Sequence, residues 1–253
     1  MEFPRVMRRK EFIKISSITG ISLTIFPHLS FKNFMEEFTR NQLIGKGNPD
    51  IVGDSYTSKM HKTAKEAFNK MKTAAAKENI NIEVVSAYRS FQRQKEIFEG
   101  KYKKFTSEGL TPEKAIEKII EYSTIPGTSR HHWGTDIDII DANAPRPANV
   151  LMPENFHGTG PFCKLKTWLN ENSESFGFYE VYTDNGNRKG FKYEPWHFSY
   201  APVSIPMLKA YKEQIDVKKM LSEEKIMGNE HFSEGFVSKY VEENILDINP
   251  KLL

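Results

Sequence analysis

The stretch TSRHHWGTDIDIID brings two adjacent histidines close to several aspartates, and both residue types bind metal ions. Between His131 and Asp138 an extended strand would cover about 23 Å, and a helix would separate them by about 10 Å along its axis. Neither conformation lets both side chains share one ion, so a metal site requires a fold-back, which we expect at Gly134. Strand alternation puts Asp136 and Asp138 on one face, and nothing intrinsic separates His131 from His132.

A second segment, EPWH, adds Glu194 and His197. In a regular strand these side chains would point to opposite faces, but Pro195 disfavours a regular ladder, and a local irregularity would turn both toward one site. The sequence has no HExxH, the common helical zinc-protease motif. One histidine and one aspartate of the first stretch, together with His197, would supply two imidazoles and one carboxylate to a catalytic zinc ion. Glu194 would then be left as the general base for a water molecule.

Arg89, in the segment SAYRS, follows a predicted strand and precedes a predicted helix. An arginine suits a substrate carboxylate or a developing oxyanion, because its planar fork makes two charge-assisted hydrogen bonds. Each of the three segments also has a purely structural interpretation: a surface arginine, a capped turn before a strand, or a glutamate beside a buried histidine. Their combination favours a metal-dependent hydrolytic site.

Three segments, SAYRSFQRQ, SRHHWGTDID and EPWH, resemble the signatures of the zinc D-alanyl-D-alanine carboxypeptidase family. This family includes the vancomycin-resistance carboxypeptidases and dipeptidases and shares its fold with the Hedgehog signalling domain. Its pattern of Ser-x-His, six residues and Asp is matched by Ser129, His131 and Asp138. The resemblance implies one Zn²⁺ ion held by His131, Asp138 and His197, with Glu194 as the catalytic base and Arg89 contacting the substrate and its oxyanion. It also implies that four further residues bind or lie near the substrate: Ser90, Gln94, Ser129 and Trp196.

The resemblance covers about residues 60–200 and includes three departures. Arg130 and His132 stand where the family often has Glu and Gln, and Asp136 stands where a small residue is usual. These departures bear on substrate preference more than on the metal. With His131 and Asp138 as ligands, His132 and Asp136 become candidates for supporting the ligands or lining the pocket.

The resemblance implies an enzyme, a metallopeptidase that cleaves peptidoglycan stem peptides containing D-amino acids, most simply at the terminal D-Ala-D-Ala bond. L,D-carboxypeptidase, D,D-dipeptidase and endopeptidase activities also occur in the family, and the sequence does not choose among them. The alternative is a non-catalytic zinc-bearing binding module of the same fold, which would have no need of a base such as Glu194. A nucleophilic role for Cys163 is a third interpretation, disfavoured because no histidine motif accompanies it.

The elements that must position these residues follow from periodicity. Helices are expected over about 58–79, 92–104, 113–122 (opened by Thr111-Pro112), 163–176, 203–225 and 231–245. Strands are expected over 81–88, 135–140, 176–183 and 190–200, the last two joined by a hairpin at Asn185-Gly186. This order predicts an α+β fold with a small, largely antiparallel sheet and flanking helices, of the Hedgehog and D-Ala-D-Ala-peptidase type.

The 253 residues divide into four expected parts. These are an export signal or membrane-proximal segment (1–30), a connecting segment (31–57), the zinc peptidase domain (58–200) and a helical C-terminal extension packed on that domain (201–253). The basic run Arg8-Arg9-Lys10 precedes an uncharged, moderately apolar stretch. The residues RRKEFIK resemble the twin-arginine export motif, with Lys10 at its second arginine. We therefore expect export to the periplasm or cell envelope, with membrane contact only through this segment if it is not cleaved.

Composition excludes several classes of protein. Residues 1–30 hold five of the 36 basic and two of the 33 acidic residues, so the remainder is neutral and lacks a nucleic-acid footprint. The single cysteine excludes an internal disulfide framework and a cysteine-rich zinc cluster. A hydrophobic content of 38% with 27% charged residues is typical of a soluble globular protein. We expect a monomer whose partner is a peptidoglycan peptide substrate.

Overall fold

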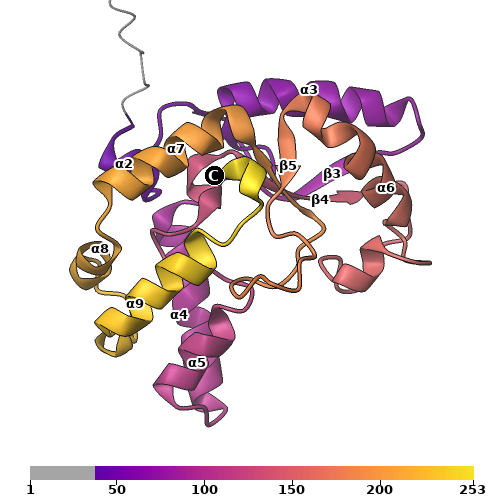
Figure 1. Cartoon of the computed structure of the whole chain (residues 1–253). Helices are drawn as coiled ribbons and strands as arrows, with labels where there is room; N and C mark the ends of the chain where they lie inside the picture. The colour runs from indigo at the N-terminus through magenta and orange to yellow at the C-terminus, as the bar shows by residue number, and fades with distance from the viewer. Residues whose placement is uncertain (1–37) are drawn as a thin grey trace, which may run out of the picture. The chain divides into compact units, whose positions relative to one another are not determined.

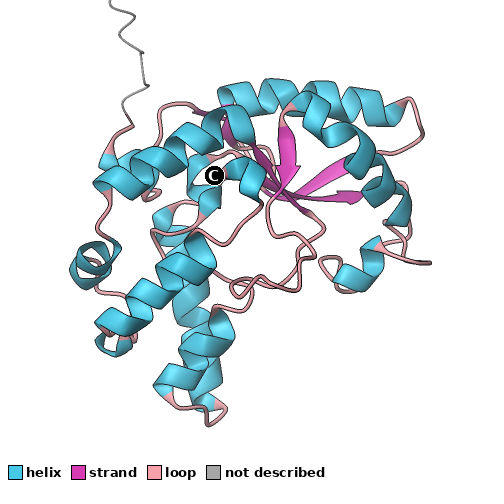
Figure 2. Ribbon diagram, viewed as in Figure 1, coloured by secondary structure: helices cyan, strands magenta, loops and turns pink. Residues whose placement is uncertain are grey.

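A four-stranded antiparallel sheet carries both motif segments in the computed structural model, which describes residues 38–253 (Figure 2). Its strands, in spatial order, are β3 (Ile82–Ser86), β4 (Asp136–Asp141), β6 (His197–Tyr200) and β5 (Phe178–Glu180). Asp138 on β4 pairs with Ser86 on β3 and with His197 on β6. The histidine-aspartate stretch and the EPWH segment are therefore neighbours in the sheet. A separate two-stranded sheet joins β1 (Ile51–Val52) to β2 (Met60–His61).

Helices flank the sheet, and the predicted α+β fold with small antiparallel sheets is confirmed (Figure 1). Helices α3 (Lys62–Ala76) and α6 (Cys163–Asn172) contribute to one hydrophobic core together with the sheet. On β4, Ile137 and Ile139 belong to that core. Because side chains alternate along a strand, Asp136 and Asp138 point to the opposite face, where the candidate site lies.

Local sequence signals set several helix boundaries. The Thr111 side chain caps α5 (Pro112–Ile119), and a proline occupies its first turn, as predicted. Ser90 caps α4 (Phe91–Ser107) in the same way. Along α3, four apolar residues at helical spacing are buried: Ala64, Phe68, Met71 and Ala75.

A second hydrophobic core joins α4 and α5 to elements from both ends of the described chain. These elements are α2 (Arg40–Leu43), α7 (Ala201–Gln214), α8 (Val217–Glu223) and α9 (Glu234–Tyr240). Residues 38–253 form one compact unit. Within these residues, no helix combines the length and apolar character required to cross a membrane. The predicted export signal, residues 1–30, lies outside the described residues.

The predicted tight hairpin at Asn185-Gly186 is wrong in its extent. Strands β5 and β6 do pair, with Phe178 opposite Tyr200, but the irregular segment 181–196 connects them. Arg188 explains the difference, because its guanidinium donates hydrogen bonds to three carbonyl oxygens, those of Thr183, Phe191 and Asp247. These bonds fold the connection onto the C-terminal segment instead of extending the ladder.

The C-terminal helices also support segment 124–130, which leads into the histidine pair. The Tyr240 hydroxyl accepts a hydrogen bond from the Ile125 amide at 3.0 Å and lies 2.8 Å from the Thr128 hydroxyl. On α7, the Tyr211 hydroxyl donates to the Gly127 carbonyl at 2.9 Å. Residues beyond 200 thus make buried polar contacts with a segment that borders the site.

Replacing Tyr240 by Phe should lower the free energy of unfolding by about 1–3 kcal/mol, because the buried Ile125 amide would lose its acceptor. Chemical denaturation of the two proteins measures this difference. Tyr122→Phe is the control, because the Tyr122 side chain is exposed and its change should leave stability within about 0.5 kcal/mol. Equal stability of all three proteins would contradict the role assigned to Tyr240.

Candidate active site

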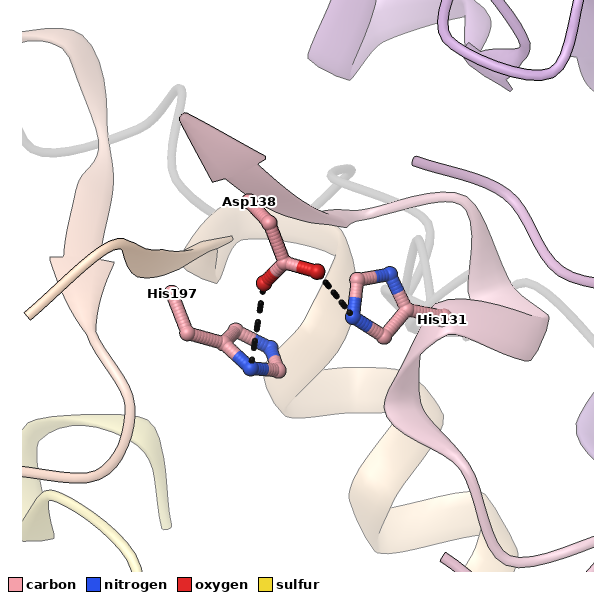
Figure 3. Close-up of side chains that lie close together, drawn as sticks. All are labelled: His131, Asp138 and His197. Carbon is pink, nitrogen blue, oxygen red and sulfur yellow. Dashed lines mark ion pairs between the residues drawn. The ribbon is translucent and has the colours of Figure 1, made fainter. Parts of the chain in front are cut away.

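Three buried side chains, His131, Asp138 and His197, converge from different elements (Figure 3). His131 Nε2 lies 3.5 Å from Asp138 Oδ2, and His197 Nδ1 lies 3.6 Å from Asp138 Oδ1. One possible ligand atom from each residue lies within 4.8 Å of the others. Ligands of a tetrahedral zinc ion at about 2.0–2.1 Å are about 3.3 Å apart, so small shifts would complete such a site.

Gly134 provides the fold-back that joins His131 to Asp138. His131 lies in a short 3₁₀ helix, Arg130–Trp133, which ends at Gly134 with φ of 71°. A Cβ atom on Gly134 would lie 2.7 Å from the backbone nitrogen of His61, so a larger residue is excluded on both counts. The chain then enters β4, which brings Asp138 back toward His131.

The two adjacent histidines make different hydrogen bonds. His131 Nδ1 lies 2.8 Å from the Ala87 carbonyl oxygen, so it donates there and leaves Nε2 facing Asp138. His132 uses both ring nitrogens elsewhere: Nδ1 lies 2.6 Å from the Arg89 carbonyl oxygen and Nε2 accepts from the Gly127 amide. The geometry therefore favours His131 as the metal ligand.

The two aspartates on this face of β4 also differ. Asp136 accepts hydrogen bonds at 2.9 Å from Arg130 Nε and His197 Nε2, and at 2.6 Å from the Ser199 hydroxyl. Asp138 Oδ1 is buried and has no hydrogen-bond partner within the described residues. An unpartnered buried carboxylate oxygen beside two imidazoles fits a cation, so the donor set suits the zinc ion that the family resemblance implies.

The protonation states of His131 and Asp138 agree with this assignment, whereas His197 would have to lose a proton. Burial lowers the pKa of His131 well below its ordinary value and raises the pKa of Asp138 to about 6. Burial also opposes the charged form of His197, but its hydrogen bonds to Asp136 and Glu194 outweigh this effect and raise its pKa to about 10. At neutral pH His131 is therefore neutral and Asp138 ionised, as metal ligands must be. On His197, a metal ion would take the place of the proton on Nδ1.

Glu194 and Arg89 border the same three residues. The irregularity expected in EPWH is present, because the His197 amide donates to the Glu194 carbonyl in a turn and Glu194 Oε2 lies 2.9 Å from His197 Nδ1. Arg89 is held by Gln94 Oε1 at 2.8 Å and by Ser86 Oγ at 3.0 Å. Its buried Nε has no partner within the described residues.

These residues line one cavity of about 350 Å³, a size suited to a small peptide ligand. Of the residues predicted near the substrate, Ser129 and Trp196 line it together with Arg89. Gln94 is fully buried and orients Arg89, whereas the Ser90 hydroxyl caps α4 by accepting from the Arg93 amide. Their roles toward a substrate stay predictions.

Several residues that line the cavity were not predicted from the sequence, among them Lys101 and Tyr182. Lys101 follows Ile97 by four residues on α4, and this spacing alone could have indicated that both share a face. Arg130 was identified only as a departure from the family pattern. Tyr182, whose ring lies edge-on 5.0 Å from the His197 ring, follows a strand and has no distinguishing local signal.

Comparison with known proteins agrees with the motifs. Residues 57–203 match the family described as VanY: D-alanyl-D-alanine carboxypeptidase, and the chain belongs to this family. A D-alanyl-D-alanine carboxypeptidase of Enterococcus faecalis is 32% identical over 143 residues, which are 56% of this chain and 48% of that protein. The chain thus spans about half the length of this relative.

The chain is also similar to solved structures, among them the following two. VanYB in complex with D-alanine-D-alanine is 25% identical, with a TM-score of 0.49 over 71% of this chain and 92% of the other. A mutant of the vancomycin resistance D,D-pentapeptidase VanY in complex with Zn(II) is also 25% identical, with a TM-score of 0.48 over 65% of this chain and 85% of the other.

Zinc binding can test the choice between the paired residues. Asp138→Ala should remove a ligand, whereas Asp136→Ala should remove only a support of His197 and lower zinc affinity by about 10–100-fold. His131→Ala should likewise lose more affinity than His132→Ala. Competition with a chromophoric chelator measures each dissociation constant. Larger losses at Asp136 or His132 than at their partners would contradict the assignment.

Proposed function

We propose that this protein is a zinc-dependent peptidase that removes the terminal residue from peptidoglycan stem peptides, most simply at a D-Ala-D-Ala bond. The observation that carries the proposal is the presence of a carboxylate, a three-residue ligand set and an arginine around one cavity. Glu194, His131, Asp138, His197 and Arg89 all line it. Membership of the VanY family supports the substrate class.

The metal would be held by His131, Asp138 and His197. When bound, a zinc ion would act as a Lewis acid and would lower the pKa of a water molecule in this site to about 7. Glu194 would accept the proton that the attacking water loses and would deliver it to the leaving amine nitrogen. Its carboxylate is only 7% exposed, so bulk water competes little for that proton.

Arg89 stabilises the negative charge that develops on the carbonyl oxygen. Gln94 and Ser86 hold its two terminal nitrogens, which fixes the direction of the guanidinium before the substrate arrives. Such preorganised donors act strongly at a site shielded from water. A non-catalytic binding module would have no need of a base such as Glu194, so the arrangement favours catalysis.

The proposed location is the cell envelope, where stem peptides occur. The basic and apolar N-terminal residues support export through a twin-arginine-like signal. Sequencing the N-terminus of the mature protein tests this: an intact Met1 in a cytoplasmic fraction would contradict it.

Incubation with a stem pentapeptide ending in D-Ala-D-Ala should release D-alanine, detected by mass. A chelator should abolish the reaction and added zinc should restore it. Glu194→Gln should lower kcat by about 100- to 10,000-fold while zinc remains bound, because the general base is lost.

The matched control is Glu171→Gln, which changes an exposed carboxylate on α6 and should leave kcat unchanged. Activity that survives complete metal removal, or a wild-type rate in Glu194→Gln, would overturn the proposed mechanism. Release of a dipeptide instead of D-alanine would change the assigned bond without changing the chemistry.

A further inference from the structure

Lys101 is a cation on the cavity wall with no role in the chemistry described above. It lies on α4, half-buried, one turn beyond Ile97, and both residues line the cavity. Within residues 38–253 its ammonium group forms no hydrogen bond and no ion pair. Most lysines with half-buried stems place the ammonium group in solvent or beside a carboxylate, so an unpaired lysine on a cavity wall needs an explanation.

The positive charge of Lys101 is not paired with a carboxylate. Burial and the nearby positive charge of Arg89 lower the pKa of Lys101, and Glu194 only partly opposes them. Two cations that form no ion pair within the described residues, Arg89 and Lys101, line the cavity with two carboxylates, Asp138 and Glu194, whereas Asp136 offsets the charge of Arg130. A divalent ion at the ligand set would add further positive charge, so the cavity favours an anionic ligand.

The backbone of Lys101 lies on a later turn of α4 than Gln94. It follows Gln94, the residue that holds Arg89, by seven residues, and this spacing is about 10 Å along a helix axis. A peptide advances about 3.3 Å per residue, so Lys101 can reach a group one to three residues from the scissile carbonyl. Tyr122 and Met152, both exposed and both lining the cavity, add an apolar border for the peptide chain.

We propose that Lys101 is a specificity-determining residue that binds a free carboxylate of the peptide substrate, so that the cavity takes acidic peptides in preference to their amides. The inference rests on the proposed peptidase function and adds the charge of its substrate. Two carboxylates of a stem peptide have this chemistry: the C-terminal one and a side-chain one on a residue before the scissile bond.

Three pentapeptides that end in D-Ala-D-Ala distinguish these sources. The parent has diaminopimelate at the third position, the second peptide has a C-terminal amide, and the third has an amidated diaminopimelate side chain. The peptide that is amidated at the carboxylate bound by Lys101 should have a kcat/KM about tenfold or more below that of the parent, chiefly through a higher KM. The reason is that amidation removes a charge-assisted bond made equally in the ground and transition states. Lys101→Met should lower the kcat/KM of the parent to the value of this amide and should not lower the kcat/KM of the amide further.

Lys103→Met is the matched control, because Lys103 is an exposed lysine on the same helix and its change should alter none of the three values. Equal cleavage of all three peptides by the wild type would overturn the inference, as would an equal loss on all three in Lys101→Met. If the wild type cleaves no peptide, the proposed function fails, and the affinity of zinc-loaded Glu194→Gln for each peptide, measured by calorimetry, tests the inference by itself. An affinity that falls on amidation and also on adding Lys101→Met supports the role of Lys101. An affinity that changes with neither, or the absence of binding, refutes it.

Discussion

The geometry of the site depends on one buried carboxylate, Asp136, placed between a guanidinium and an imidazole. Its Oδ2 lies 2.9 Å from Arg130 Nε and 2.9 Å from His197 Nε2. Burial alone would raise the pKa of Asp136, but the charge of Arg130 and the bond from His197 hold it below its ordinary value. A buried ion pair adds little net stability compared with apolar residues of the same size. The pair therefore acts chiefly by orientation, fixing His197 with Nδ1 toward Asp138 and Glu194.

The rest of the fold brings distant segments to this carboxylate. Arg130 belongs to the turn that carries His131, Asp136 begins β4, and Ser199, which bonds both of them, lies on β6. The segment before Arg130 is in turn held by Tyr240 from the C-terminal helices. Arg130 and Asp136 are also two of the three departures from the family pattern, and their contact indicates that they belong together.

Sequence reasoning succeeded where the cause is local. The Thr111 cap, the strand β4 and the turn at Gly134 each depend on neighbouring residues, and each is present. The hairpin prediction failed at Asn185-Gly186, because the Arg188 guanidinium donates a hydrogen bond to the carbonyl oxygen of Asp247, which lies 59 residues further along the chain. Periodicity could not choose between Asp136 and Asp138, and the family register made that choice. Neither source revealed the Arg130–Asp136 pair, which depends on the fold-back between these two residues, or the place of Lys101 on the cavity wall, which depends on how α4 packs.

A crystal structure of the zinc-loaded protein, with anomalous data at the zinc absorption edge, tests the central claim most directly. The account predicts one peak about 2.0–2.2 Å from His131 Nε2, an Asp138 oxygen and His197 Nδ1. It also predicts that His197 Nε2 stays bonded to Asp136. A peak between His132 and Asp136, or a His197 ring turned so that Nε2 binds the metal, would contradict it.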